Sequence, residues 1–136
     1  MTAGFELPPY ARAMGMLVLD RDAPGAPVVA MDFAEKSEGR PGYLHGGAIG
    51  GLLEMAGFAA LHADLAQRGI EARFKPINIS IEYLRNGLPQ RVFARGEVLR
   101  AGRRIANVRI EAWQGDGTAP IASCWMNFQL SAVKAA

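Results

Sequence analysis

The chain has 136 residues, of which 50% are hydrophobic and 21% are charged, and its formal net charge is +2 at pH 7. This length predicts one domain spanning residues 1–136, and the high apolar fraction excludes a disordered chain. The single cysteine, Cys124, excludes a disulfide scaffold and is typical of a reducing compartment, so we expect a cytoplasmic protein. Cys124 lies in an alternating apolar series, which favours a buried structural thiol over a nucleophile.

Neither a nucleic acid nor a membrane is an expected partner. The pI is near 9.0, but 15 basic residues stand against 13 acidic ones, and no basic helix or aromatic–basic motif occurs. No apolar run approaches the ~20 residues that span a bilayer, and the N-terminal segment lacks the continuous apolar stretch of a secretory signal.

The first half of the chain predicts two short strands and one long helix. The strands are expected at 16–20 and 28–33, separated by turn residues, and the polar segment 35–43 is expected to be a loop. Segment 45–68 is the helix, and Gly69 stands where a C-terminal cap glycine belongs. The apolar residues that repeat at the helical period are Ile49, Leu52, Leu53, Ala56, Ala60 and Ala63.

The second half predicts four strands, at 76–85, 91–100, 105–113 and 121–130, each with alternating apolar and polar residues. Because no helix intervenes, these strands are expected to be largely antiparallel. The fold class is therefore α+β, with about six strands wrapped around one long helix, since both must bury an apolar face. Such a sheet leaves an exposed edge, and pairing with a second subunit is a common way to cover one, so we expect a homodimer.

Glycines gather at the start of this helix, at positions 46, 47, 50, 51 and 57, although each costs ~1 kcal/mol relative to alanine inside a helix. Gly46 and Gly47 fall in the first turn, where backbone N–H groups lack helical partners and favour an anion or a developing oxyanion. A bare tight turn is the other interpretation of this pair. We expect Gly50, Gly51 and Gly57 to allow close packing of the helix on the sheet.

Glu54 is the only charged residue in the apolar stretch 46–58, so it either faces solvent or points into a cleft. At ~1.5 Å per residue it lies about 12 Å along the helix from Gly46, too far for both to act on one atom. Two antiparallel helices in a dimer would bring Glu54 of one subunit opposite Gly46 of the other.

Other polar residues give weaker signals. His45 is a candidate helix cap or hydrogen-bond donor, or a structural histidine of the loop, and His62 is expected to serve packing or the surface. Two distant histidines and one cysteine supply no metal cluster. A set of arginines around the later strands suits either a nucleotide-bearing substrate or solvated hairpins: Arg85, Arg100, Arg103 and Arg104.

Segment 43–56, which reads YLHGGAIGGLLEMA, resembles the HGG-x(6)-[DE]-x-A signature of hotdog-fold acyl-CoA thioesterases. The most similar group is the phenylacetate-pathway and 4-hydroxybenzoyl-CoA thioesterase type. Segments 79–85 (ISIEYLR) and 98–104 (VLRAGRR) resemble the strand and the hairpin that follow the helix in that family.

The resemblance implies a hotdog fold, active sites at a dimer interface, and dimers that often pair into tetramers. It implies that Gly46 polarises the thioester carbonyl, that Glu54 of the opposing subunit is the nucleophile or general base, and that His45 supports the turn. The substrate is expected to contact Gly47, Gly39, Phe58, Tyr83, Arg103 and Arg104, the two arginines near the coenzyme A phosphates. No metal or further cofactor is implied, since coenzyme A is part of the substrate.

Two positions depart from the family pattern. Gly39 stands where members often carry Asn or Gln, and Phe58 stands where some carry Thr or Ser. Both changes remove polar groups that help to hold the carbonyl or the water. The sequence therefore predicts an acyl-CoA thioesterase and leaves a non-catalytic acyl-CoA-binding or ligand-sensing hotdog protein as the alternative. A dehydratase or hydratase is less favoured, because His45 lacks the required spacing to an acid.

Overall fold

The computed structural model describes residues 5–19 and 25–133. It contains two α-helices, α1 (Pro9–Ala13) and α2 (Gly46–Gln67), and a short 3-10 helix, η1 (Glu35–Ser37). The strands are β1 (Leu17–Leu19), β2 (Val28–Met31), β3 (Ala72–Tyr83), β4 (Val92–Ala101), β5 (Ile105–Trp113) and β6 (Pro120–Ala132). They form one six-stranded antiparallel sheet in the order β1-β2-β4-β5-β6-β3.

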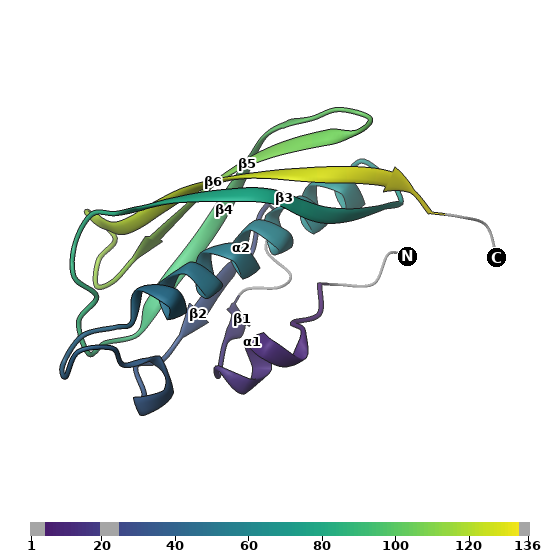
Figure 1. The fold of residues 1–136 in the computed structure, drawn as a ribbon. Coiled ribbons are helices and arrows are strands. Elements are labelled where there is room, and N and C mark those ends of the chain that lie inside the picture. Colours follow the sequence, from purple (N-terminus) through teal and green to yellow (C-terminus); the bar gives the residue numbers. More distant parts are fainter. Residues whose placement is uncertain (1–4, 20–24, 134–136) are drawn as a thin grey trace.

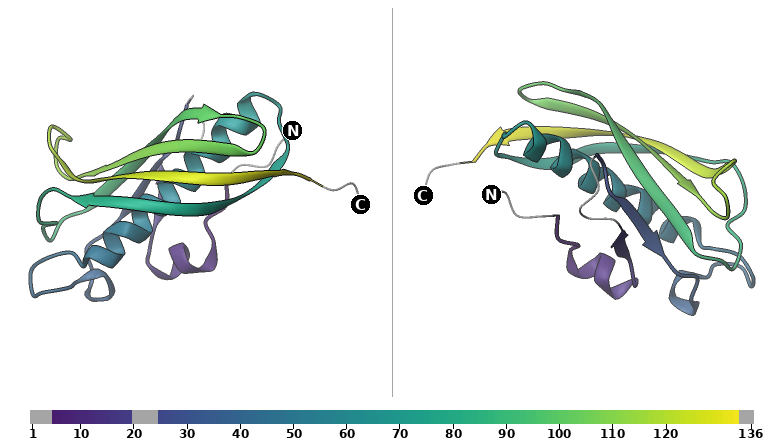
Figure 2. Two further views of the ribbon diagram at one scale, coloured as in Figure 1. Left: turned by 45° about the horizontal axis from the view of Figure 1, so that its top comes forward. Right: turned by 180° about the vertical axis from the view of Figure 1, so that it is seen from behind.

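The sheet curves around α2, and the core lies between them (Figure 1). Figure 2 shows α1 on the side of α2 that faces away from β3, β5 and β6. The residues of β4, β5 and β6 predicted to share one face are buried or half-buried against the helix, while their neighbours point outward. The predicted α+β class and hotdog arrangement are confirmed.

Most predicted elements are present with small shifts at their ends. The long helix has His45 as its N-cap and Arg68 as its C-cap, and Gly69 has the expected positive φ of 67°. Strand β3 begins at residue 72 rather than 76, because Pro76 is tolerated within an edge strand, where a missing N–H breaks no central ladder. Strand β2 ends at Met31, before the predicted end at Phe33. Asp20, the predicted end of the first strand, lies outside the described residues.

Three local features were missed, and one of them is η1, which lies in the segment 35–43 that was expected to be a loop. Helix α1 has only five residues, too few to show a helical period, although Pro9 at its first position is a common start signal. The predicted alternation in β3 is wrong at Ile77, because a bulge between Pro76 and Asn78 removes it from the ladder. Ile79, Ile81 and Tyr83 keep the helix-facing side, as their pairing with buried residues of β6 shows.

Strand β3 is one of the two edge strands of the sheet and is paired only with β6. Its apolar side chains remain accessible in the single chain: Ile77 is 54% exposed and Tyr83 is 55% exposed. An uncovered apolar edge of this kind is a template for pairing with another strand.

Glycines set how closely α2 approaches the sheet. A Cβ at Gly57 would lie 2.8 Å from the Met126 sulfur, and a Cβ at Gly50 would lie 3.0 Å from Cδ1 of Ile81. These two glycines serve helix–sheet packing as predicted. Gly51 does not, because its Cα faces Tyr10 of α1 rather than the sheet.

By length and composition alone, helix α2 is long and apolar enough to cross a membrane. This differs from the expectation that no apolar segment of the chain is long enough to span a bilayer. However, 67% of its most apolar window is buried inside the structure, as in the core helix of a folded domain.

Candidate functional site

His45 caps the N-terminus of α2. Its backbone is extended, with φ −70° and ψ 134°, and its Nδ1 accepts a hydrogen bond of 2.8 Å from the N–H of Gly47. The N–H of Gly46, at the first helical position, has no hydrogen-bond partner within residues 5–19 and 25–133. Of the two amides that the sequence offered to a ligand, only that of Gly46 is therefore available.

The turn before α2 is held from the side of η1. The N–H of His45 donates to the carbonyl of Ser37 at 2.8 Å, and the N–H of Gly39 donates to the carbonyl of Tyr43 at 2.9 Å. A Cβ at Gly39 would lie only 3.0 Å from Cα of His45, so the backbone there approaches more closely than most side chains allow. Gly39 thus lies beside His45 and presents no polar side chain to a ligand.

The loop between β3 and β4 packs against the same turn. The carbonyl of Gly87 accepts a hydrogen bond of 2.9 Å from the N–H of Leu44, and a Cβ at Gly87 would lie 2.7 Å from Cδ1 of Leu44. The side chain of Gln114 fixes this loop by bonding both the N–H and the carbonyl of Leu88 at 2.9 Å. This contact supports the site, and no sequence pattern predicted it.

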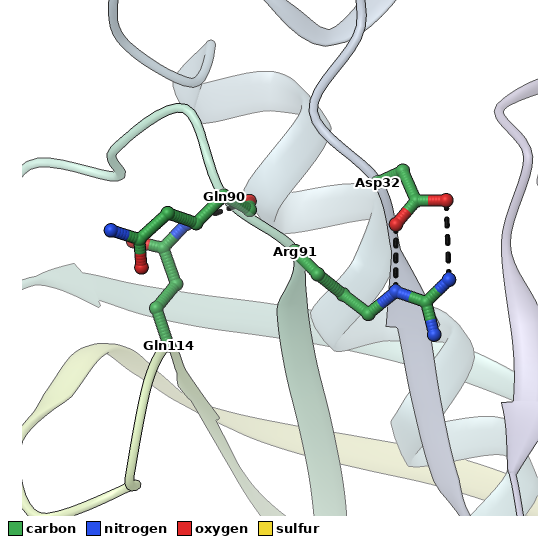
Figure 3. A network of polar contacts seen from close by, with 4 residues as sticks. All are labelled: Asp32, Gln90, Arg91 and Gln114. Carbon is green, nitrogen blue, oxygen red and sulfur yellow. Dashed lines mark hydrogen bonds and ion pairs between the residues drawn. The ribbon is translucent and has the colours of Figure 1, made fainter.

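The start of β4 is tied to β2 by an ion pair (Figure 3). Arg91 donates from Nε to Asp32 Oδ1 at 2.6 Å and from Nη2 to Oδ2 at 3.2 Å, while Gln114 contacts the carbonyl of Gln90 at 3.0 Å. Hydrogen bonding by the Arg91 guanidinium lowers the pKa of Asp32 below its usual value. These contacts hold the loop that carries Gly87.

Tyr83, at the end of β3, joins the sheet to the helix start. Its hydroxyl donates a hydrogen bond of 2.9 Å to the carbonyl of Gly46. A Cβ at Gly46 would lie 3.5 Å from the Tyr83 ring, an ordinary contact, so the tyrosine forms one wall beside the free amide. The structure thus brings Tyr83, Gly46 and His45 together.

Glu54 lies in the middle of α2 and is half-buried. Among the residues that the structure describes, its carboxylate has no hydrogen-bond or ion-pair partner. Glu54 and Gly46 belong to one unbroken helix, which keeps them ~12 Å apart along its axis. One chain alone therefore does not bring the carboxylate and the free amide to the same atom.

Cys124 is buried on the side of β6 that faces the helix carrying Glu54. Burial, with a smaller contribution from the negative charge of Glu54, raises the pKa of the Cys124 thiol to about 12. The thiol is therefore neutral at physiological pH, which agrees with a structural role rather than a nucleophilic one.

Phe58, one turn after Glu54, belongs to an aromatic cluster. Its ring centroid lies 5.1 Å from that of Phe128 on β6, edge to face, and 5.8 Å from that of Phe74 on β3. This packing occupies the place where a hydroxyl would otherwise stand near Glu54. The local environment after Glu54 is therefore apolar.

The arginines do not form one cluster. Arg103 lines a recess of about 480 Å³ that also includes Leu65, near the C-terminal end of α2 and ~28 Å along the helix from Gly46. Arg104 lies in the same hairpin, whereas Arg85 follows β3 near the other end of α2 and donates to the carbonyl of Pro120 at 3.0 Å. The expected grouping of Arg85 with the hairpin arginines is therefore wrong.

Metal-binding geometry is not seen in the described part of the chain, where no three His, Cys, Asp or Glu side chains gather. Within a single chain, the arrangement is thus a free backbone N–H at a helix start, walled by a tyrosine, with an unpaired carboxylate two turns further along the same helix.

The sequence of the chain matches a known protein family. Residues 41–121, more than half of the chain, match the family model of the thioesterase superfamily. The chain belongs to the thioesterase superfamily.

Solved structures agree with this assignment. A Chromobacterium violaceum protein shares 34% sequence identity, with a TM-score of 0.71 over 93% of this chain and 85% of that one. Zebrafish thioesterase superfamily member 2 shares 26% identity, with a TM-score of 0.72 over 85% of this chain and 81% of that one. A Haemophilus influenzae thioesterase shares the fold at 20% identity, with a TM-score of 0.78 over 90% of this chain and 82% of that one. No curated protein matches the chain significantly.

Membership in this superfamily supports thioester hydrolysis as the class of reaction. The roles of the individual residues, the acyl-CoA substrate and the subunit arrangement stay predictions.

Proposed function

We propose that the protein is a homodimeric thioesterase that hydrolyses an acyl-CoA thioester to a free acid and coenzyme A. The observation that carries this proposal is the free N–H of Gly46 on the same helix as the unpaired, half-buried carboxylate of Glu54. A half-buried carboxylate without a partner is uncommon, because desolvation without compensation is unfavourable, and a functional role would account for it.

The dimer is proposed to form through the uncovered edge strand β3, whose apolar side chains would then be covered. In a dimer with its two-fold axis beside β3, the two α2 helices would lie antiparallel. Glu54 of one subunit then lies opposite Gly46 of the other, which removes the ~12 Å separation within one chain. Two such dimers are proposed to pair into a tetramer, and the protein is proposed to act in the cytoplasm.

In the proposed reaction the N–H of Gly46 donates a hydrogen bond to the thioester carbonyl oxygen, and the helix start stabilises the negative charge that develops there. Glu54 of the partner subunit acts as a general base and takes a proton from water as the water oxygen attacks the carbonyl carbon. The C–S bond then breaks, and the coenzyme A thiolate leaves and is protonated. His45 and Tyr83 hold the turn, and Gly47 and Gly39 keep it open to the substrate.

Direct attack by the Glu54 carboxylate is the other chemical route. A carboxylate oxygen would bond to the carbonyl carbon as the C–S bond breaks and the coenzyme A thiolate leaves, giving an acyl-enzyme anhydride that water then cleaves to the free acid and the Glu54 carboxylate. Arg103 and Arg104 are proposed to contact the coenzyme A phosphates from the partner subunit, because antiparallel helices carry the partner's hairpin toward the Gly46 end. Phe58 would contact the acyl group.

The main test measures thiol release from short, medium and aryl acyl-CoAs by the wild type, Glu54→Gln and Gly46→Pro. Proline is favoured at the first helical position, and His45 already has the extended backbone that precedes a proline, so Gly46→Pro removes the N–H while the helix remains. We expect kcat to fall roughly 10²–10³-fold when this donor is lost. Glu97→Gln, on the outer face of β4, is the matched control and should keep wild-type activity.

Mixed dimers test the shared site. A dimer that pairs Glu54→Gln with Gly46→Pro contains one intact site if the two groups act across the interface, and none if they act within one chain. Activity regained on mixing two inactive variants supports the proposal. Unchanged activity of Glu54→Gln would refute the role of Glu54, whatever the assembly.

The absence of polar side chains at Gly39 and Phe58 favours the second candidate function, an acyl-CoA-binding protein without turnover. Calorimetric binding of an acyl-CoA by the wild type, with no thiol release from any of the substrates, would support it.

A further inference from the structure

Tyr10 of the N-terminal helix α1 packs directly against Gly51 of α2. A Cβ at Gly51 would overlap the hydroxyl oxygen of Tyr10 and lie 3.0 Å from Cε2 and Cζ of its ring. The Tyr10 hydroxyl therefore lies directly on the surface of α2, in the space that a side chain at position 51 would fill. Only glycine permits this contact.

The contact lies next to Glu54. Residues three apart on a helix have Cβ positions about 5–6 Å from one another, and the Tyr10 hydroxyl adjoins the Cβ position of residue 51, three residues before Glu54. Helical side chains lean toward the N-terminus, so Glu54 leans over the turn that contains Gly50 and Gly51. Neither glycine has a side chain that would stand between the Glu54 carboxylate and the Tyr10 hydroxyl.

The Tyr10 hydroxyl is free to bind a ligand. Within the described ranges it has no hydrogen-bond partner, and the side chain is 48% exposed. Tyr83, by contrast, uses its hydroxyl on the carbonyl of Gly46. A phenol can both donate and accept a hydrogen bond, which suits it to hold a water molecule beside a carboxylate.

We propose that Tyr10 positions the water molecule that Glu54 activates. This inference rests on the proposed thioesterase function and adds a positioning residue to it. Phe58 leaves no hydroxyl on the turn after Glu54, and Tyr10 supplies one on the turn before it. During the reaction the water gives its proton to Glu54 and its oxygen bonds to the carbonyl carbon, while Tyr10 keeps its own proton and acts only through a hydrogen bond.

The test compares Tyr10→Phe with the wild type in thiol release from acyl-CoA. Phenylalanine keeps the ring against Gly51 and removes only the hydroxyl. Loss of one hydrogen bond to the reacting water should lower kcat roughly 10-fold with KM and Tm little changed. Tyr43→Phe, whose ring lies against Arg40 rather than α2, is the matched control and should behave as the wild type.

Gly51→Ala tests the position rather than the chemistry. Alanine is the better helix former, so the helix should persist, but its Cβ displaces the Tyr10 hydroxyl. We expect a similar fall in kcat, and no further fall when Gly51→Ala is added to Tyr10→Phe. An equal loss from Gly51→Ala in both backgrounds would show that Gly51 acts independently of the hydroxyl and would contradict the inference.

The outcomes separate this inference from the function on which it rests. An active wild type, an inactive Glu54→Gln and a fully active Tyr10→Phe would overturn the role of Tyr10 alone. A wild type that releases no thiol, or a Glu54→Gln variant as active as the wild type, would overturn both.

Discussion

Gly96 on β4 is where α2 and the sheet approach each other with the least freedom to adjust. A Cβ at Gly96 would lie 2.7 Å from Cβ of Ala60 and 3.1 Å from the carbonyl oxygen of Ala56. The first distance is 0.7 Å shorter than the 3.4 Å at which ordinary van der Waals contact begins. Neither neighbour is the end of a flexible side chain, so Gly96→Ala must move α2 away from the sheet.

The size of the effect follows from this overlap. Adding a methyl group to a filled core typically costs ~1–3 kcal/mol, which for a chain of this length lowers Tm by roughly 3–10 °C. Ala56 is only two residues from Glu54, so the same displacement should also lower thioesterase turnover. Gly102→Ala is the matched control, because its Cβ would meet only the carbonyl oxygen of Ile105, at an ordinary 3.6 Å.

Urea and thermal unfolding of the wild type and both variants, at one protein concentration, provide the measurement. A fixed concentration matters because the stability of a dimer depends on it. A Gly96→Ala variant as stable as Gly102→Ala would show that the helix–sheet spacing is not constrained at this point, and would refute the reasoning.

Two further predictions concern the loop beside the site and the buried thiol. Gly87→Ala should displace Leu44 and lower the free energy of unfolding by ~1–3 kcal/mol. It should also lower turnover, because Leu44 adjoins His45, and unchanged kinetics would contradict this support role. Cys124, with its pKa raised from 9.0 to about 12, contributes stability below pH 9 that is lost as the pH rises toward about 12. The urea midpoint of the wild type should therefore fall more steeply over that range than that of Cys124→Ala, and equal slopes would show that the thiol titrates normally.

Hydrophobic periodicity was sufficient to predict most of the fold. The 3.6-residue period located α2 within one residue at each end, and the alternating period identified β5 with its observed bounds. Short or edge elements were less accessible, because five residues show no period in α1 and one extra residue in β3 shifts the register without changing composition.

For the candidate site, the motif spacing placed His45, Gly46 and Glu54 on one helix and their ~12 Å separation followed from the helical rise alone. Local sequence could not reveal which amide remained free, because that depends on the direction of the His45 ring, which turns its Nδ1 onto Gly47. Nor could local sequence show that Arg85 and Arg103 lie far apart. Strand β4 runs between them, so they lie at opposite ends of the strands.

The sequence by itself determined that a carboxylate and a glycine-rich helix start lie in one apolar helix, because helical geometry is local and repeats with every turn. Only the tertiary structure decided what surrounds them. Tyr83 comes from 37 positions further along the chain and contacts Gly46, whereas Tyr10 comes from a helix that precedes α2 and occupies the space left by Gly51. Such contacts depend on how separate elements pack, and packing distances of a few ångströms are not encoded in the spacing of any single segment.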